Sequence, residues 1–173
     1  PSRPRRPGQR PTRLEAELAR YQRGEVWYRD TIEAAEVGTW SWDLTNGELA
    51  WSTRCKALFG LPPEMKVDYD LFLSLLHPED RDGVDAAVQK ALSEVGDYDA
   101  FSRVVFPDGS LQWRRFKGKA YADQGKTYRF QGVVIDATAQ KKSEQDLKLA
   151  LERANAAEGE AQRVLESMAD GFF

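Results

Sequence analysis

The stretch GTWSWDLTNGELAWS, residues 38–52, contains two runs in which apolar and polar side chains alternate. In the first run Trp40 and Trp42 alternate with polar residues, and this period of two predicts a β-strand. Asn46-Gly47 follows, which is the strongest short sequence signal for a β-hairpin. The alternation then resumes in ELAWS. The stretch therefore predicts two antiparallel strands.

The same period of two returns three times in the second half of the chain, over residues 98–106, 111–122 and 127–136. The turn sequences at 107–109 and 123–125, each ending in glycine, separate these three runs. Connections this short predict that the three strands form an antiparallel meander.

Residues 52–97, between the hairpin and the meander, have the composition of several short helices. Ser52 or Thr53 can cap the first helix. Pro78 lies in the first turn of the longest one, a position that tolerates proline. The predicted order is two strands, a helical crossover and three strands, which is an α+β fold.

Two amphipathic helices are predicted outside this core, at residues 12–37 and from 139 onward. The first is expected to be broken or bent near Gly24. In both helices, residues recur at alternating spacings of four and three, as in a marginal coiled coil. The first seam consists of Leu14, Leu18, Tyr21, Glu25, Tyr28, Ile32 and Ala35. The second consists of Leu147, Leu151, Ala154, Glu158, Ala161, Leu165, Met168 and Phe172.

Five motifs in this order resemble a PAS domain with its C-terminal PAC motif, of the subgroup common in bacterial sensor histidine kinases. The resemblance covers roughly residues 36–147. It rests on GTWSWDLTNGELAWS (38–52), LFGL (58–61), LLHPEDR (75–81), FPDGSLQWRR (106–115) and GVVIDATAQKKSEQDL (132–147).

The resemblance implies a five-stranded antiparallel sheet whose crossover helices enclose a small cavity. Such domains bind a small molecule or a cofactor, or serve only to dimerise, and they pass their state to a following helix. The family's joint to that helix is an Asp-x-Thr tripeptide, which here is Asp136-Ala137-Thr138. Asp136 can accept hydrogen bonds and pair with a cation, and Thr138 can cap the helix. We therefore expect these two residues to relay the signal.

The resemblance also divides the chain into parts. A basic tail (1–11) is expected to be disordered, since arginine and proline dominate it. An N-terminal signalling helix (12–37), the PAS/PAC sensory domain (38–138) and a C-terminal helical linker (139–171) follow. Residues 172–173 are expected to begin a further domain of the same type, which makes the chain a piece of a longer array.

Two residues invite a cofactor interpretation that their contexts disfavour. His77, the only histidine, could ligate a haem, but it directly precedes Pro78, where a helix begins, and a structural role is favoured. Cys55, the only cysteine, could form a flavin adduct, but it lacks the sequence context of such photosensors and is expected in the core. The sequence does not identify a cofactor.

The indoles of Trp40, Trp42 and Trp51 could form an aromatic wall for a ligand. We favour a place in the core or in an interface, beneath a flanking helix or a second subunit. The basic run around residues 114–119 could bind phosphate or nucleic acid, but a solvated strand with acidic cross-strand neighbours is the favoured interpretation. It comprises Arg114, Arg115, Lys117 and Lys119.

The bulk composition sets further limits on location and chemistry. With 173 residues, 41% of them hydrophobic, the chain can bury one ordinary core. It lacks an apolar run long enough to span a membrane or to serve as a signal peptide, so we expect a cytoplasmic protein. Five arginines and no acid lie in residues 1–13, and we favour a solvated linker there over a nucleic-acid or membrane arm. No set of catalytic residues can be assembled.

These observations support a sensory PAS module that forms a parallel homodimer and belongs to a multidomain bacterial protein, with a histidine kinase as the expected output. Its expected partners are neighbouring PAS or kinase domains and a small-molecule ligand, not nucleic acid. One alternative is a ligand-free module for dimerisation and spacing. The other is the input domain of a cyclic-dinucleotide cyclase or phosphodiesterase.

Overall fold

Five antiparallel strands form a single sheet in the order β2-β1-β5-β4-β3. The computed structural model describes residues 12–170. The strands are β1 (Gly38–Asp43), β2 (Glu48–Trp51), β3 (Asp97–Val105), β4 (Leu111–Asp123) and β5 (Lys126–Asp136). The helices are α1 (Arg13–Ala34), α2 (Thr53–Leu58), α3 (Tyr69–Leu75), α4 (Pro78–Glu94) and α5 (Thr138–Asp170). The predicted α+β fold, with its hairpin, crossover and meander, is confirmed.

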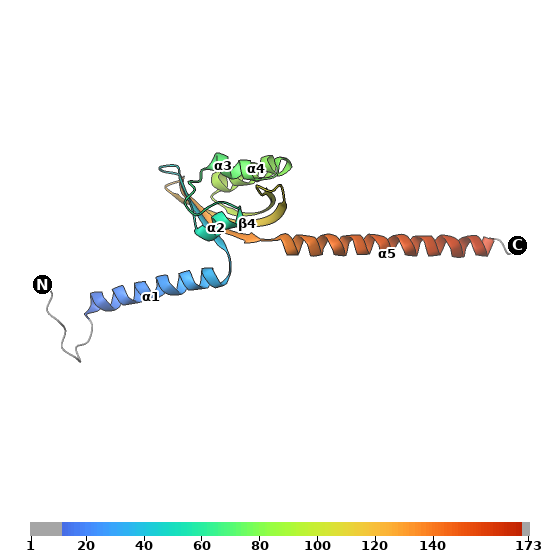
Figure 1. Ribbon diagram of the computed structural model, residues 1–173, viewed down its shortest axis with the longest axis horizontal. Helices are drawn as coiled ribbons and strands as arrows, with labels where there is room; N and C mark the ends of the chain where they lie inside the picture. The colour runs from blue at the N-terminus through green and yellow to red at the C-terminus, as the bar shows by residue number, and fades with distance from the viewer. Residues whose placement is uncertain (1–11, 171–173) are drawn as a thin grey trace.

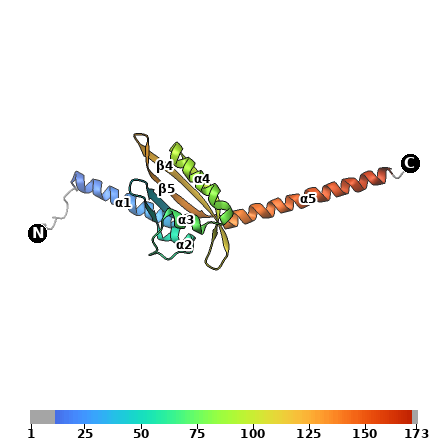
Figure 2. The same cartoon turned by 90° about the horizontal axis from the view of Figure 1, so that it is seen from above.

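The crossover helices α2, α3 and α4 lie over one face of the sheet, as Figures 1 and 2 show from two directions. Side chains of that inner face alternate along each strand with side chains of the outer face. On β4, for example, Phe116 and Ala120 point inward and are buried, while Lys117 points outward and is exposed. The hydrophobic core therefore lies between the sheet and the crossover.

The β1–β2 hairpin forms at the predicted place, and Trp40 pairs with Trp51 across it. Its loop spans four residues, 44–47, and only Gly47 has positive φ, at 78°. The Asp43 carboxylate accepts hydrogen bonds from the backbone and the hydroxyl of Thr45, so a side chain stabilises the turn.

Polar side chains cap the crossover helices as their sequence positions suggest. Ser52 Oγ accepts the Cys55 N–H at the start of α2, and Asp68 Oδ1 accepts the Leu71 N–H at the start of α3. His77 takes the same position before α4, where Pro78 is the first helical residue. These caps satisfy backbone donors that a helix leaves unpaired at its beginning.

The two flanking helices extend away from the sheet in opposite directions (Figure 1). The predicted break in the first is wrong: α1 continues through Gly24, where the nearest neighbours leave open space. A single exposed glycine costs a helix only about 1 kcal/mol, which the remaining turns can offset. The predictions for the tail (1–11), residue 171 and residues 172–173 fall outside the described residues.

Candidate functional site

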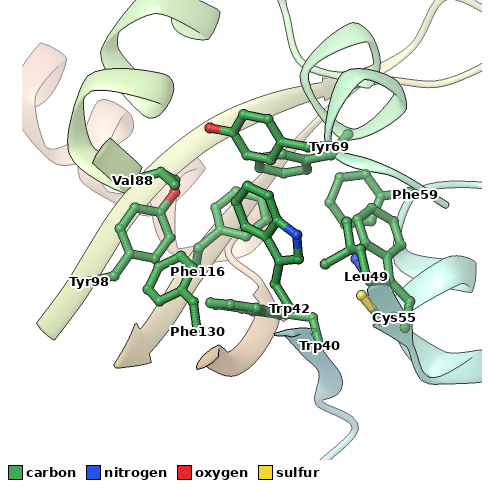
Figure 3. A pocket seen from close by; sticks show the side chains of 12 residues that line it. Trp40, Trp42, Leu49, Cys55, Phe59, Tyr69, Val88, Tyr98, Phe116 and Phe130 are labelled. Atoms are coloured by element: carbon green, nitrogen blue, oxygen red, sulfur yellow. The ribbon is translucent and has the colours of Figure 1, made fainter. Parts of the chain in front are cut away.

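An apolar cavity of about 40 Å³ lies between the inner face of the sheet and the crossover helices (Figure 3). It is lined by Trp40, Trp42, Leu49, Trp51, Cys55, Phe59, Tyr69, Phe72, Val88, Tyr98, Phe116 and Phe130. An apolar cavity of roughly 150 Å³ holds a benzene molecule, and one water needs about 10–15 Å³. In this conformation the cavity therefore has room for only a few atoms.

The three tryptophans that the sequence singles out all line this cavity. Trp42 stacks on Tyr69 of α3, with ring centroids 4.8 Å apart and planes inclined by 14° (Figure 3). Trp40 packs edge-on against Phe130 at 4.8 Å. The crossover helices cover these side chains. From the sequence alone we expect a flanking helix or a second subunit to cover them. The three tryptophans thus pack against the core and also line the cavity.

Trp40 lies flat against the sheet because two glycines leave space for it. Trp40 pairs with Gly132 on β5, and Gly132 pairs with Gly118 on β4, so the three residues form a row across three strands. A Cβ atom added at Gly118 would lie 2.6 Å from the indole of Trp40, and one at Gly132 would lie 2.7 Å from it. This close approach requires the glycine at 118, whereas a Cβ at Gly132 would meet the backbone oxygen of Lys117 even before it met Trp40.

In Gly118→Ala, the added methyl group should displace Trp40 and destabilise the domain by about 2 kcal/mol, the usual scale for an overpacked core. The near-ultraviolet circular dichroism of the tryptophans should change as well. Gly159→Ala on α5 is the control, since its Cβ would meet open space and alanine favours a helix. Equal stabilities for the two variants in urea unfolding would contradict the assigned position of Trp40.

Two polar atoms of the cavity wall are buried and have no hydrogen-bond partner among the residues that the structure describes. They are the indole nitrogen of Trp40 and the hydroxyl of Tyr98. Burial also raises the pKa of Tyr98, so its hydroxyl stays protonated. Tyr69 differs, because its hydroxyl donates to Asp85 Oδ1 at 2.8 Å. A small neutral molecule that accepts a hydrogen bond, or a water, suits such a wall.

The two cofactor candidates are not placed for cofactor chemistry. Cys55 lines the cavity and is a core residue, as predicted, but burial raises its thiol pKa, which disfavours the reactive thiolate. His77 is not part of the lining; its Nδ1 accepts the Glu79 N–H at 3.4 Å as the cap of α4. Residues 12–170 contain no cluster suited to a metal ion. The described residues thus place Cys55 in the core and His77 at a helix cap outside the cavity lining.

The second part of the site is the joint between β5 and α5. Asp136 Oδ1 accepts the backbone N–H of Thr138 at 2.9 Å. The prediction that Thr138 caps the helix is wrong, because Thr138 is the first helical residue and its hydroxyl bonds the backbone of Trp113 on β4. The N–H of Ala137 also donates to the carbonyl of Trp113, at 2.9 Å. The joint is thus fastened to the neighbouring strand.

The predicted basic run on β4 divides between the two faces of the sheet. Arg115, Lys117 and Lys119 point outward, and each lies within 4.0 Å of an aspartate on β3, as the solvated-strand interpretation predicts. Arg114 points inward, is only 2% exposed, and forms an ion pair with Asp136 at 3.1 Å. Sequence analysis missed this role, although Arg114 shares its parity with the inward residues of β4.

The pKa of Asp136 reflects these contacts. Partial burial works to raise it, but hydrogen bonds from Thr138 and the charge of Arg114 outweigh burial, so the pKa is lowered. Asp136 is therefore ionised at neutral pH, as an acceptor at the beginning of a helix should be.

Comparison with known proteins agrees with this architecture. A sequence model of the PAS fold matches residues 48–134. The chain is 35% identical over 123 residues to the sensor protein FixL of Bradyrhizobium diazoefficiens, an alignment that covers 70% of this chain and 24% of FixL. It is 25% identical over 106 residues to the probable diguanylate cyclase DgcE of Escherichia coli, covering 61% of this chain and 10% of that protein.

A solved structure gives the same result. A sensory box histidine kinase/response regulator from Burkholderia thailandensis is 27% identical, with a TM-score of 0.63, over 75% of this chain and 98% of that one. The domain is thus related to sensor modules of histidine kinases and of diguanylate cyclases. The chain spans about a quarter or less of the two curated relatives named above.

Proposed function

Because this chain belongs to the PAS family, we propose that it is the cytoplasmic sensory and dimerisation module of a multidomain bacterial signalling protein, most simply a sensor histidine kinase. No helix within residues 12–170 has the length and apolarity needed to cross a membrane. The input in this proposal is a change in the aromatic cavity, and the output is the position of α5. The observation that carries it is the fastened joint between β5 and α5.

The contacts at the joint support a relay. Thr138 and Ala137 are bonded to Trp113, and Asp136 is bonded to both Thr138 and Arg114. Lys141, one turn into α5, lies 4.2 Å from the ring centroid of Phe101 on the outer face. Because the first turn is held on several sides, a change in sheet packing must change the direction of α5 or break one of these contacts.

The exposed seams of α1 and α5 support a homodimer. On α5 the exposed fraction is 60–72% for Leu147, Leu151 and Leu165. On α1 it is 68–72% for Leu14 and Tyr21. Apolar residues at these heptad spacings are buried when a second helix packs against them. A second copy in parallel orientation supplies such a helix and brings the two output helices together.

Substitution of the joint tests the relay in the full-length parent. Asp136→Ala and Thr138→Ala should each leave a folded protein whose output no longer responds to its signal, because each removes side-chain contacts that hold the start of α5. Output activity is measured with and without signal. Asp123→Ala, at the exposed opposite end of the β4–β5 hairpin, is the control and should stay regulated. Normal regulation in both joint variants would refute the relay.

A ligand-free spacer is the second candidate function, and the small volume of the cavity favours it. The unpartnered atoms of Trp40 and Tyr98 favour a ligand instead. A mass spectrum of molecules released from the purified protein, together with its visible absorption, separates the two. The similarity to DgcE, a probable diguanylate cyclase, supports a cyclic-dinucleotide cyclase as the alternative output. The sequence of the parent protein after Phe173 decides that question.

A further inference from the structure

Arg114 is a charged side chain in the interior of the domain. Its side chain is 2% exposed, which is as buried as the core residues around it. A buried charge is tolerated only when it is paired and hydrogen-bonded. Burial lowers the pKa of Arg114, while the charge of Asp136 acts in the opposite direction. The contacts of this guanidinium therefore determine whether its charge is tolerated in the interior.

The guanidinium contacts three different parts of the chain. Its Nε donates to the carbonyl of Leu58 at 2.7 Å, and its Nη1 lies 3.1 Å from Asp136 Oδ1. Two further bonds stay within β4, from Nη2 to Gln112 Oε1 at 2.6 Å and from Nη1 to the carbonyl of Trp113 at 3.0 Å. All three nitrogens of the planar group are thus engaged, which fixes its orientation.

The two long-range partners are helix ends. Leu58 is the last residue of α2, and a carbonyl there has no partner within its own helix. Asp136 accepts the first N–H of α5. Arg114 therefore places one cation between the C-terminus of α2 and the carboxylate at the N-terminus of α5. The helix dipoles favour the cation at the end of α2 and the carboxylate at the start of α5.

The same end of α2 forms part of the cavity wall. Phe59, the residue after Leu58, lines the cavity and packs on Trp51 and Phe116, with ring centroids 4.5 and 6.0 Å away. A molecule or a rearrangement that displaces the backbone of Phe59 also moves the Leu58 carbonyl, because both belong to one planar peptide unit. The guanidinium must then follow the carbonyl or lose one of its bonds.

We propose that Arg114 is a positioning residue that couples the cavity wall to the output helix, by holding the end of α2 and the start of α5 with one rigid group. The proposal rests on the proposed function for its output, since it assumes that the position of α5 is the signal. It adds a route within the domain: Phe59, Leu58, Arg114, Asp136 and then Thr138.

The test measures amide hydrogen exchange at residues 138–142 of the purified chain. Phe59→Leu perturbs the end of α2 from the cavity side without adding a charge. In an otherwise unchanged chain it should alter exchange at residues 138–142 by roughly tenfold, the effect of weakening a hydrogen bond to a charged group. In the Arg114→Met background the same substitution should leave these rates unchanged.

Controls separate coupling from folding. Methionine matches much of the volume of arginine, and Asp136, whose side chain is 50% exposed, can be solvated when its partner is removed. Arg115→Met, on the outer face beside Asp99, should keep the full response to Phe59→Leu. Arg114→Lys keeps the charge without the planar group and should restore only part of the response. Asp136→Asn keeps an acceptor for Thr138 but removes the ion pair, and it tests the last step if Arg114→Met fails to fold.

The outcomes distinguish this proposal from the proposed function. If Phe59→Leu still changes exchange in both Arg114→Met and Asp136→Asn, or has no effect in the unchanged chain, the route through Arg114 is wrong. The relay in the full-length parent can still hold in that case, because its own test measures regulated output. If the response disappears in Arg114→Met and persists in Arg115→Met, the coupling role is supported.

Discussion

In Phe116→Ala, we expect the free energy of unfolding to fall by about 3–5 kcal/mol, the range for removing a buried aromatic ring. Phe116 is 3% exposed and lies at the centre of the aromatic cluster, with Phe59 and Phe72 at centroid distances of 6.0 and 5.7 Å. Its loss removes dispersion contacts and leaves a space that the rigid sheet cannot close. Urea unfolding followed by tryptophan fluorescence measures the change.

The same substitution should turn the small cavity into a site for an apolar molecule. The space left by the ring adds to the existing 40 Å³, and apolar cavities of roughly 150 Å³ bind benzene. Benzene should therefore raise the unfolding midpoint of Phe116→Ala and leave the unchanged protein unaffected, since binding to the folded state stabilises it.

Phe101→Ala is the matched control for this experiment. Phe101 follows Ala100, the cross-strand neighbour of Phe116, but its ring packs on the outer face against Arg115 and Lys141. Its removal should cost less stability and give no response to benzene. A benzene response in Phe101→Ala, or none in Phe116→Ala, would show that the cavity is not where the structure places it.

The fold follows from local sequence patterns to an unusual degree, because each element carries its own signal. The indoles of Trp40 and Trp42 mark one face of β1, and the turn sequences mark the ends of the strands. The order of the sheet, in which β1 pairs with β5, is not contained in those patterns and is known from the structure. Periodicity gives each strand a face but does not select its neighbour.

The site is only half predictable, for a physical reason. Asp136 and Thr138 could be named because they match the Asp-x-Thr joint of the family that the sequence resembles. Arg114 does not, since four cations in six residues suggest a solvated surface, and its partners are 56 and 22 residues away in the chain. The cavity volume depends on how twelve side chains pack together, and no pattern within one element encodes that.

The second large effect concerns Asp80, which attaches the start of α4 to β3. Its carboxylate accepts bonds from the backbone N–H of Arg103 at 2.8 Å and from Nε and Nη2 of the same arginine at 3.0 and 2.6 Å. The hydroxyl of Ser102, a fully buried side chain, donates to it as well. In Asp80→Ala the backbone N–H and the Nε of Arg103 lose their acceptor, while Nη2 keeps Glu79 Oε2 at 2.9 Å. We expect the free energy of unfolding to fall by about 3 kcal/mol.

This effect should depend on pH in a defined direction. The side chain of Arg103 is the main cause that lowers the pKa of Asp80, and it outweighs the opposing effect of burial. A carboxylate whose pKa is lower in the folded state stabilises the protein fully above its unfolded pKa of about 3.9, and the stabilisation disappears as pH falls through the folded pKa. The difference between the unchanged protein and Asp80→Ala should thus be constant near neutrality and shrink below about pH 4.

Two further variants isolate the cause of the Asp80 effect. Asp82→Ala lies on the same helix with an exposed side chain and should change stability by less than about 0.5 kcal/mol at any pH. Asp80→Asn keeps an oxygen acceptor but not the charge, so it should lose part of the stability and show the same pH dependence relative to the unchanged protein as Asp80→Ala. A difference that grows as the solution becomes more acidic would show that Asp80 is not held ionised by Arg103. In that case the folded state would favour the neutral carboxyl. A difference that stays constant in acid would instead show that the contact between α4 and β3 does not depend on the charge of Asp80.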